Sequence, residues 1–577
     1  MLTIPRFVAY PPPMPSSAVR FTGLTALLAI LLALAAYFAA LGSDHAATNG
    51  DELLYAQMTY ATAESGHWLP LQTMIERHRN TKPPALFWQG IVSTDWVKNY
   101  TLWNLRWPNA LYTFATALMV FLIARQISAS RSTGLLAALV YLAFFGTYRY
   151  GRVFLTSAPE TFWLFLPIFV LLVGSHEGQR DKLCWPVSLG CGLFVGAALL
   201  YKSFALVLPA AVALAWWTLH QHSYQVGPWL RREMPRVVAM TFVALGVFSL
   251  WYWLDPQRHL ILQDFVLKEN VGKFDTGGRN YFLNLLWGES SIWRNVISYP
   301  FNAGLLAPAL VALFVITWLR RRELTNDEKL LWIWIITVLA VFTLPNQRDE
   351  RYLLPGMPAL AVLLALHWTQ IPRWILGITL LAVAVISLGM GLGAVLLTND
   401  AGLGLLYPWF YWLFIAAVIA FAAVGLWRQD LTRSFAAPAV LLLYLAYAAF
   451  LLPFDGPRGE FDRATADFAR GKSIAAPINF NAREEIYRFM LPQADLAPYH
   501  VNDYALDRLK AENNLFIITL PLRDRSVENS PDLRIVGTRL QLIDRFNNQE
   551  TIDMLTGHVS RNLFKKDLLV EVIQPAP

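Results

Sequence analysis

The chain has 577 residues, of which 56% are hydrophobic and only 15% are charged. A soluble globular protein has about 45–50% apolar and about 25% charged residues, so this composition excludes an ordinary soluble enzyme and indicates a membrane protein. A net charge of +7 suits nucleic-acid binding, but the basic clusters alternate with long apolar runs, which is typical of membrane topology instead.

Residues 1–20 form a short proline-rich tail before the first apolar segment. That segment is too long for the apolar core of a cleavable signal peptide, so we expect it to remain as a signal anchor. A membrane-spanning helix needs about 20 apolar residues. About thirteen segments are candidates: 21–42, 109–127, 134–150, 158–174, 185–201, 203–219, 237–254, 299–319, 330–345, 352–368, 374–397, 405–427 and 434–453.

Positive charge predicts the orientation of these spans. With the N-terminus in the cytoplasm, basic groups such as Arg320–Arg322 and Arg428 fall in cytoplasmic loops, as the positive-inside rule requires. An odd number of spans then places the C-terminus in the periplasm of a bacterial inner-membrane protein. Cys184 and Cys191 lie at and inside one apolar segment, where we expect packing residues and not a disulfide.

The predicted fold class is therefore mainly α: a polytopic membrane protein with about 13 transmembrane helices and a small C-terminal α/β domain outside the membrane. Residues 1–453 form the transmembrane domain, in which 43–108 and 255–298 are long outer segments. Residues 454–577 are charged and form the outer domain. In it, 514–522 and 567–573 are predicted strands, and 482–491 and 548–559 are predicted helices.

The first outer segment opens with two adjacent carboxylates, Asp51 and Glu52, and closes on Lys82 before two prolines. A carboxylate there accepts a proton from an attacking hydroxyl or holds a metal. The alternative is a helix N-terminus, where negative charge is favourable. Pro83 restricts the backbone of Lys82 to extended geometry and so holds its ammonium in a defined place.

More cations fall on the same predicted membrane face. Lys202 interrupts a long apolar run, Lys273 lies in the sequence KENVGKF, and Arg348, Arg351 and Tyr352 open a later span. Each alone is explained equally well as an interfacial anchor. Their convergence on the outer face, against the positive-inside trend, favours a site for an anionic ligand, since lysine and arginine both bind phosphate.

Several other site classes have no signal in the sequence. We find no phosphate-binding loop of the Walker type, no zinc-spaced set of His and Cys, and no nucleophile elbow. A nucleotide-sugar or ATP substrate therefore has no visible site, and the energy for any reaction has to arrive with the substrate.

Taken together, these residues resemble the GT-C membrane glycosyltransferases, and within them the branch of the lipid A aminoarabinose transferases and the protein O-mannosyltransferases. Asp51-Glu52 with Tyr55-Ala56 resembles the DE-x-x-YA opening of that branch, and Thr81–Pro84 resembles its EKPP. Arg106 resembles its next-loop arginine. Similar likenesses follow at GHWLPL, RVFLTSAP, Lys202-Ser203, KENVGKF and RYLLPGMP, in the order of the family and over about residues 50–360.

The resemblance implies an inverting transferase that moves a sugar from a polyprenyl-phosphate carrier to a lipid (lipid A-like), glycan or protein acceptor at the outer face. It implies Asp51 as base or acceptor-orienting group, with Glu52 as its catalytic neighbour. The residues implied for the carrier phosphate are Tyr55, Lys82, Lys202, Lys273, Arg348, Arg351 and Tyr352. No nucleic acid is expected as a partner.

The sequence departs from the family pattern at positions that matter. Thr81 replaces the glutamate of EKPP, and Lys268 stands where the aminoarabinose transferases have a histidine; in those enzymes the two residues can hold a metal. We therefore assign no metal and no other cofactor. Ser157 replaces an aspartate. These changes keep two alternatives open, a polytopic transporter and a non-catalytic lipid-binding member of the same fold.

Overall fold

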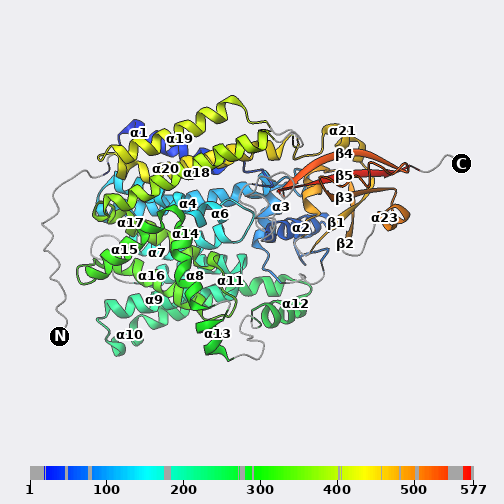
Figure 1. The fold of residues 1–577 in the computed structure, drawn as a ribbon. Coiled ribbons are helices and arrows are strands. Elements are labelled where there is room, and N and C mark those ends of the chain that lie inside the picture. The colour runs from blue at the N-terminus through cyan, green and yellow to red at the C-terminus, as the bar shows by residue number, and fades with distance from the viewer. Residues whose placement is uncertain are drawn as a thin grey trace.

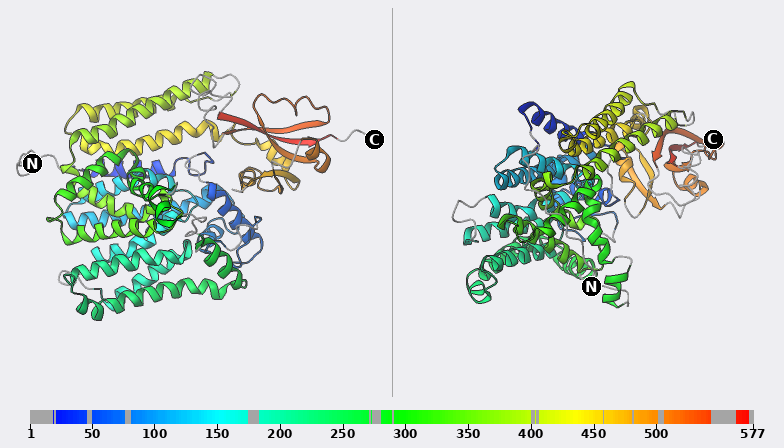
Figure 2. Two further views of the ribbon diagram at one scale, coloured as in Figure 1. Left: turned by 60° about the horizontal axis from the view of Figure 1, so that its bottom comes forward. Right: turned by 60° about the vertical axis from the view of Figure 1, so that its left-hand side comes forward.

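The computed structural model describes residues 19, 21–45, 50–75, 81–173, 183–270, 272, 280–288, 291–399, 403, 406–456, 458–479, 482–500, 506–542 and 563–573. Most of this chain is a bundle of helices that lie side by side, with a small sheet at one end (Figure 1). Helices α2 and α3 lie at the same end of the bundle as the sheet, and two further views show the sheet projecting beyond the helices (Figure 2).

The helices of the first half include long apolar ones and short interfacial ones. They are α1 (Gly23–Phe38), α2 (Gly50–Glu64), α3 (Ala85–Ser93), α4 (Leu102–Ser128), α5 (Arg131–Ala143), α6 (Phe145–Tyr150), α7 (Ser157–Val173), α8 (Trp185–Tyr201), η2 (Phe204–Leu206), α9 (Val207–Gln221), α10 (Val226–Arg232), α11 (Met234–Leu254), α12 (Arg258–Leu260) and the π-helix η3 (Ile261–Asn270). A π-helix is rare and often marks a functional site.

The second half of the bundle also combines long apolar helices with short ones. Its helices are α13 (Tyr281–Trp287), α14 (Ile292–Ala303), η5 (Gly304–Leu306), α15 (Ala307–Leu319), α16 (Asn326–Thr343), η6 (Glu350–Gly356), α17 (Met357–Leu366), η7 (Trp368–Gln370), α18 (Arg373–Asn399), α19 (Trp409–Trp427) and α20 (Thr432–Asp455). Thr325 and Glu328 form a capping box at the start of α16, which fixes where that helix begins.

Each of the thirteen predicted spans overlaps a helix, but the number of spans is not confirmed. By length and composition, seven stretches of the described chain are able to cross a membrane: 102–128, 204–221, 234–254, 281–319, 373–399, 409–427 and 432–455. Four apolar helices are shorter, 23–38, 131–143, 157–173 and 185–201. A backbone break accounts for part of the difference, because the span predicted at 352–368 is divided between η6 and α17. Gly304, with φ of +59°, ends α14 inside another predicted span, although the apolar stretch 281–319 continues across it.

The C-terminal part contains a five-stranded sheet in the order β2-β1-β3-β5-β4. Its strands are β1 (Ser473–Ile478), β2 (Asp495–His500), β3 (Leu515–Pro521), β4 (Leu533–Leu542) and β5 (Phe564–Val572), with helices α21 (Arg463–Ala469), α22 (Glu485–Met490) and α23 (Leu506–Glu512). β1 is parallel to β2 and β3, whereas β5 is antiparallel to β3 and β4.

The mainly helical fold with a small C-terminal sheet confirms the predicted fold class. The strands predicted at 514–522 and 567–573 correspond to β3 and β5, and the helix predicted at 482–491 contains α22. The helix predicted at 548–559 lies outside the described residues. Cys184 and Cys191 are both free thiols; Cys191 is buried, as expected for a packing residue, whereas Cys184 is exposed.

Candidate active site

One group of predicted site residues converges where the N-terminus of α2 meets η6. The Asp51 carboxylate lies 2.8 Å from the Arg351 guanidinium. The next residue, Tyr352, presents its ring to two cations: the Arg351 guanidinium lies 6.0 Å and the Lys202 ammonium 4.5 Å from the ring centre. Cations over an aromatic face are attracted by its quadrupole. Residues from three distant stretches of the chain thus form one charged cluster.

Tyr55 and Lys82 join this cluster. Tyr55 follows Asp51 by one helical turn, is 6% exposed, and lies close enough to Lys82 and Arg351 for their charges to act on its hydroxyl. The Lys82 ammonium lies 2.6 Å from the Glu269 carboxylate, near the end of the π-helix η3. Burial disfavours the charged lysine, but Tyr55 and Glu269 outweigh it and raise the pKa of Lys82. Lys82 is therefore cationic at neutral pH.

Lys202 reaches the cluster because the chain breaks there. It follows the last residue of α8, and the Ser203 hydroxyl accepts a hydrogen bond from the Ala205 amide to start the next helix. The Lys202 ammonium lies 2.7 and 3.0 Å from the two oxygens of Glu160, which is 1% exposed. Burial lowers the pKa of Lys202, and Glu160 opposes that effect. Lys202 thus has a carboxylate partner, which a lysine between two apolar helices requires.

Every cation of the cluster has a carboxylate partner. Asp51 pairs with Arg351, Glu160 with Lys202, and Glu269 with Lys82, while Asp349 lies 3.4 Å from the Arg351 Nε. An anionic ligand bound here would therefore share these cations with carboxylates. The cations are already held together before any ligand binds, which is the arrangement required of the predicted phosphate site.

The predicted catalytic role of Glu52 is not supported by its position. Glu52 is 1% exposed, and Arg106 donates to both of its oxygens, at 2.6 and 2.7 Å. The Phe154 amide donates to it as well, at 2.7 Å. Arg106 also donates to the carbonyls of Leu41 and Ser43. A carboxylate with these partners is sealed from substrate, so its role is to fasten the start of α2 to α4 and to the segment after α1.

One predicted phosphate ligand, Arg348, has a different set of contacts. Arg348 is 4% exposed and its Nε donates to the Thr343 carbonyl at the end of α16, so it caps that helix. Capping the last carbonyls is a common role for arginine at a helix C-terminus. Lys273 lies outside the described residues. The other predicted site residues lie together in the cluster, and their roles remain predictions. They are Asp51, Tyr55, Lys82, Lys202, Arg351 and Tyr352.

Neither Glu160 nor Glu269 is among the site residues predicted from the sequence. Both supply the counter-charges that the clustered lysines require. The requirement itself is visible in the sequence, because a lysine inside an apolar run needs an anion. Which carboxylate fills it depends on contacts across 42 residues for Lys202 and across 187 residues for Lys82.

The two positions that differ from the metal-binding pattern do not fit a divalent metal. Thr81 offers a hydroxyl, and Lys268 offers an ammonium that lies 2.8 Å from Asp264. An ammonium has no lone pair to give to a metal and repels it. We derive no step of the reaction through a metal.

The C-terminal part holds α2 in place from its other side. The buried Gln57 amide donates to Glu484 at 3.1 Å, and its oxygen accepts from the Met74 amide at 3.2 Å. Arg488 stacks 4.0 Å from the Tyr60 ring centre. The helix that begins with Asp51 is therefore clamped between the outer segment leading to Lys82 and the helix α22.

Comparison with known proteins gives consistent matches. The family described as dolichyl-phosphate-mannose-protein mannosyltransferase matches residues 20–259. An undecaprenyl phosphate-α-4-amino-4-deoxy-L-arabinose arabinosyl transferase of Pseudomonas fluorescens is 28% identical over 345 residues, which cover 57% of each chain. The match thus spans little more than half of that relative. The corresponding transferase of Pseudomonas paraeruginosa is 28% identical over 452 residues, 76% of this chain and 77% of its own.

Among solved structures, ArnT from Cupriavidus metallidurans bound to undecaprenyl phosphate superposes with a TM-score of 0.63. The superposition covers 96% of this chain and 99% of that one at 16% sequence identity, so it shows a shared fold. The helical bundle with its terminal sheet is the same architecture from end to end. The chain is accordingly an integral membrane protein with the GT-C fold, and its sequence is similar to the aminoarabinose transferases and the protein mannosyltransferases.

Proposed function

We propose that this protein transfers a sugar from a polyprenyl-phosphate carrier to an acceptor at the outer face of the bacterial inner membrane. The observation that carries the proposal is the convergence of Asp51, Arg351, Lys202 and Tyr352 in one cluster at the start of α2. The names of the relatives support the donor, since they are undecaprenyl-phosphate-sugar transferases. The acceptor is a lipid similar to lipid A, a glycan, or a protein.

In this reaction the bond between the anomeric carbon and the carrier phosphate oxygen breaks, and a bond to the acceptor oxygen forms. The electron pair of the broken bond stays on the phosphate, so the phosphate is the group whose negative charge increases. Lys82, Lys202 and Arg351 stabilise that charge, and interactions that strengthen in the transition state lower the barrier. Tyr55 and Tyr352 donate hydrogen bonds to the phosphate oxygens.

Asp51 takes the proton of an acceptor hydroxyl. Its side chain is 37% exposed, so an acceptor reaches it from the outer side. When carrier phosphate engages Arg351, the Asp51 carboxylate is released from its ion pair and is free to approach the acceptor hydroxyl. A single displacement of this kind inverts the anomeric configuration. If the acceptor is an already ionised phosphate, Asp51 orients it and takes no proton.

The orientation follows from the charge pattern of the sequence. Helix α2, whose first turn carries Asp51, and the C-terminal sheet lie at one end of the bundle (Figure 1), and the positive-inside rule assigns that end to the periplasm. The N-terminus is then cytoplasmic. Cysteine substitutions at Asp462 and Ser434, labelled in intact cells with an impermeant reagent, test this: Asp462→Cys should react before lysis and Ser434→Cys only after it.

The function is tested by comparing cells with and without the gene. Mass spectrometry of lipid A, envelope glycans and exported proteins should show one of them losing a sugar in the deletion strain and regaining it with the wild-type gene. Complementation with Asp51→Asn should not restore the sugar. Unchanged masses in all three fractions would overturn the proposal.

A further inference from the structure

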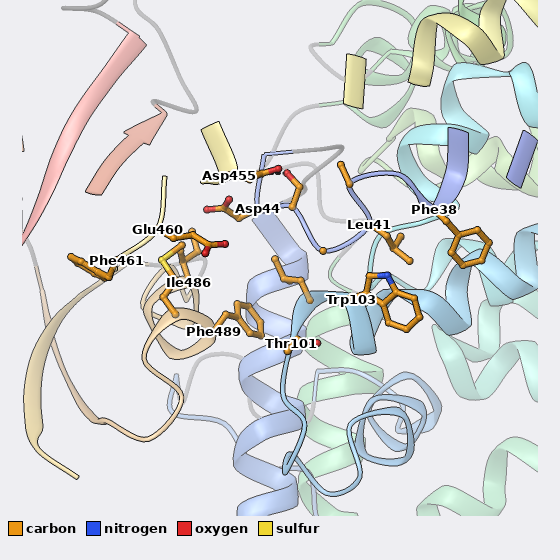
Figure 3. Close-up of a pocket in the computed structure, with 15 residues that line it drawn as sticks. Phe38, Leu41, Asp44, Thr101, Trp103, Asp455, Glu460, Phe461, Ile486 and Phe489 are labelled. Carbon is orange, nitrogen blue, oxygen red and sulfur yellow. Dashed lines mark hydrogen bonds between the residues drawn. The ribbon is translucent and has the colours of Figure 1, made fainter. Parts of the chain in front are cut away.

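A cavity lies apart from the Asp51 cluster, where the outer ends of α1, α4 and α20 meet α22 (Figure 3). Its volume is about 530 Å³, within the range of about 300–1,000 Å³ typical of small-ligand sites. We call it the junction cavity and define it by Phe38, Asp44, Trp103, Asp455, Glu460 and Phe489. We propose that the junction cavity binds a membrane amphiphile through a primary ammonium head group.

One side of the junction cavity is acidic. Asp44, Asp455 and Glu460 come from different segments and gather on the same side (Figure 3). In the part of the chain that the structure describes, the exposed Glu460 makes neither a hydrogen bond nor an ion pair, so its carboxylate is available to a ligand. Partial burial, and after it the negative charges of Asp44 and Asp455, raise the pKa of Glu460.

Two cations face these carboxylates and do not balance them. The His45 ring Nδ1 lies 2.9 Å from both Asp44 and Asp455. Burial disfavours its charge, but the two carboxylates raise the pKa of His45 to about 9. Arg539 lies 3.6 Å from Asp44 but 2.8 Å from the buried Asp567, to which its charge is mainly committed. The wall therefore keeps a net negative charge, which selects a cationic ligand.

The opposite side of the junction cavity is aromatic and apolar. Phe38 and Trp103 lie across it from the carboxylates (Figure 3), and Trp103 is 47% exposed. A half-exposed tryptophan at the end of a long apolar helix is typical of the membrane–water interface. Aromatic faces beside carboxylates are the chemistry that binds ammonium groups. An apolar tail on the ligand then continues along the outer surface of α1.

Arg106 joins the wall of the junction cavity to the catalytic helix. Its guanidinium donates to the carbonyls of Leu41 and Ser43, which line the cavity, and to Glu52, next to Asp51. An occupant of the junction cavity therefore contacts the segment that anchors the start of α2. The ligand is distinct from the sugar donor, whose phosphate is repelled by the three carboxylates.

The test uses the full chain in dodecyl maltoside micelles, which carry no ammonium group. The probe is a photoreactive alkylamine with a diazirine in its chain, mapped by peptide mass spectrometry. We expect label in residues 38–44, 101–103 and 455–461, competed by dodecylamine and not by dodecanol of equal chain length. Label competed equally by both compounds would mean an apolar crevice only and would overturn the proposal.

Glu460→Gln separates charge recognition from folding, because in the described chain this carboxylate makes no ion pair. The variant should need at least about tenfold more probe for half-maximal labelling, the usual size of a lost charge-assisted contact. The matched control is Glu323→Gln, an exposed carboxylate in the turn before α16, which should label as wild type. Sugar transfer should be retained in both variants. Unchanged labelling in a folded Glu460→Gln protein would refute the proposed ammonium site. It would not contradict the proposed transferase function.

Discussion

The Asp51 carboxylate and the Arg351 guanidinium lie 2.8 Å apart, although 300 residues separate them in the chain. The proposed base and a proposed phosphate ligand thus share one ion pair before any substrate arrives. In the proposed reaction, binding of the carrier phosphate to Arg351 weakens this pair and leaves Asp51 free to accept a proton. The proposal therefore predicts that donor binding is coupled to activation of the acceptor.

Asp51→Asn keeps the size of the side chain and removes its charge. We expect sugar transfer to fall by at least about tenfold, and by about 10²–10⁴ if the acceptor is a hydroxyl, because that is the usual contribution of a general base. Thermal stability should change little, since an ion pair this exposed contributes about 1 kcal/mol or less. Initial rates with purified protein, beside its unfolding curve, test both statements. Near-normal transfer would mean that Asp51 has no catalytic role and only supplies negative charge in the first turn of α2.

Glu52→Gln is the matched control one residue further on and should show the opposite pattern. Arg106 would be left buried without its carboxylate partner, and breaking such a pair typically costs about 3–5 kcal/mol. The expected result is low yield and a lower unfolding temperature. Any folded fraction should bind carrier with nearly unchanged affinity. A stable Glu52→Gln enzyme without activity would instead restore the catalytic role predicted for Glu52.

The difference between Asp51 and Glu52 also shows how far the sequence predicts the site. Adjacent carboxylates at a membrane boundary indicate function, but successive residues of a helix point about 100° apart, and only the partners decide which one faces substrate. Likewise, Arg348 and Arg351 are nearly one helical turn apart in sequence, yet one caps α16 and the other pairs with Asp51. The apolar spans were located by composition alone, whereas their breaks, such as Gly304, depend on tertiary packing.

Lys82→Ala should lower turnover as well as raise the apparent KM for the carrier, because the phosphate gains charge as the sugar leaves. Loss of one charge-assisted contact is worth about 1.5–3 kcal/mol, or about ten- to hundredfold in kcat/KM. Lys82→Arg should rescue poorly, since the planar guanidinium is larger than the compact ammonium that pairs with Glu269. Steady-state kinetics on the purified variants provide the measurement.

Two further variants check whether the lysines share one phosphate. A double variant of Lys82→Ala and Lys202→Ala should lose less than the sum of the single losses, because both cations touch the same group. Glu269→Gln should bind the carrier more tightly, since it removes the carboxylate that competes for Lys82. Additive losses with turnover intact would mean that the lysines are separate interfacial anchors.

The contact between α22 and α2 should weaken as the pH rises. Burial and the neighbouring Glu485 raise the pKa of Glu484 from an ordinary 4.5 to about 7, so the folded protein favours the protonated carboxyl. Stability from this group is complete below about pH 4.5 and is lost as the pH rises towards 7 and above. This shift in the pKa of Glu484 corresponds to about 3 kcal/mol in the free energy of unfolding. Hydrogen exchange of the α22 and α2 amides should therefore be slower at pH 5.5 than at pH 8, after correction for intrinsic rates.

Glu484→Gln removes the titrating group and keeps a carbonyl oxygen to accept from the Gln57 amide. In this variant the difference in protection between pH 5.5 and pH 8 should shrink, and protection at pH 8 should rise above that of the wild type. Asp467→Asn, an exposed carboxylate of the same C-terminal part, should leave the pH dependence unchanged. Because α2 begins with Asp51, tighter docking at low pH should also hold the base more firmly. A wild-type pH dependence that persists in Glu484→Gln would assign the effect to another group.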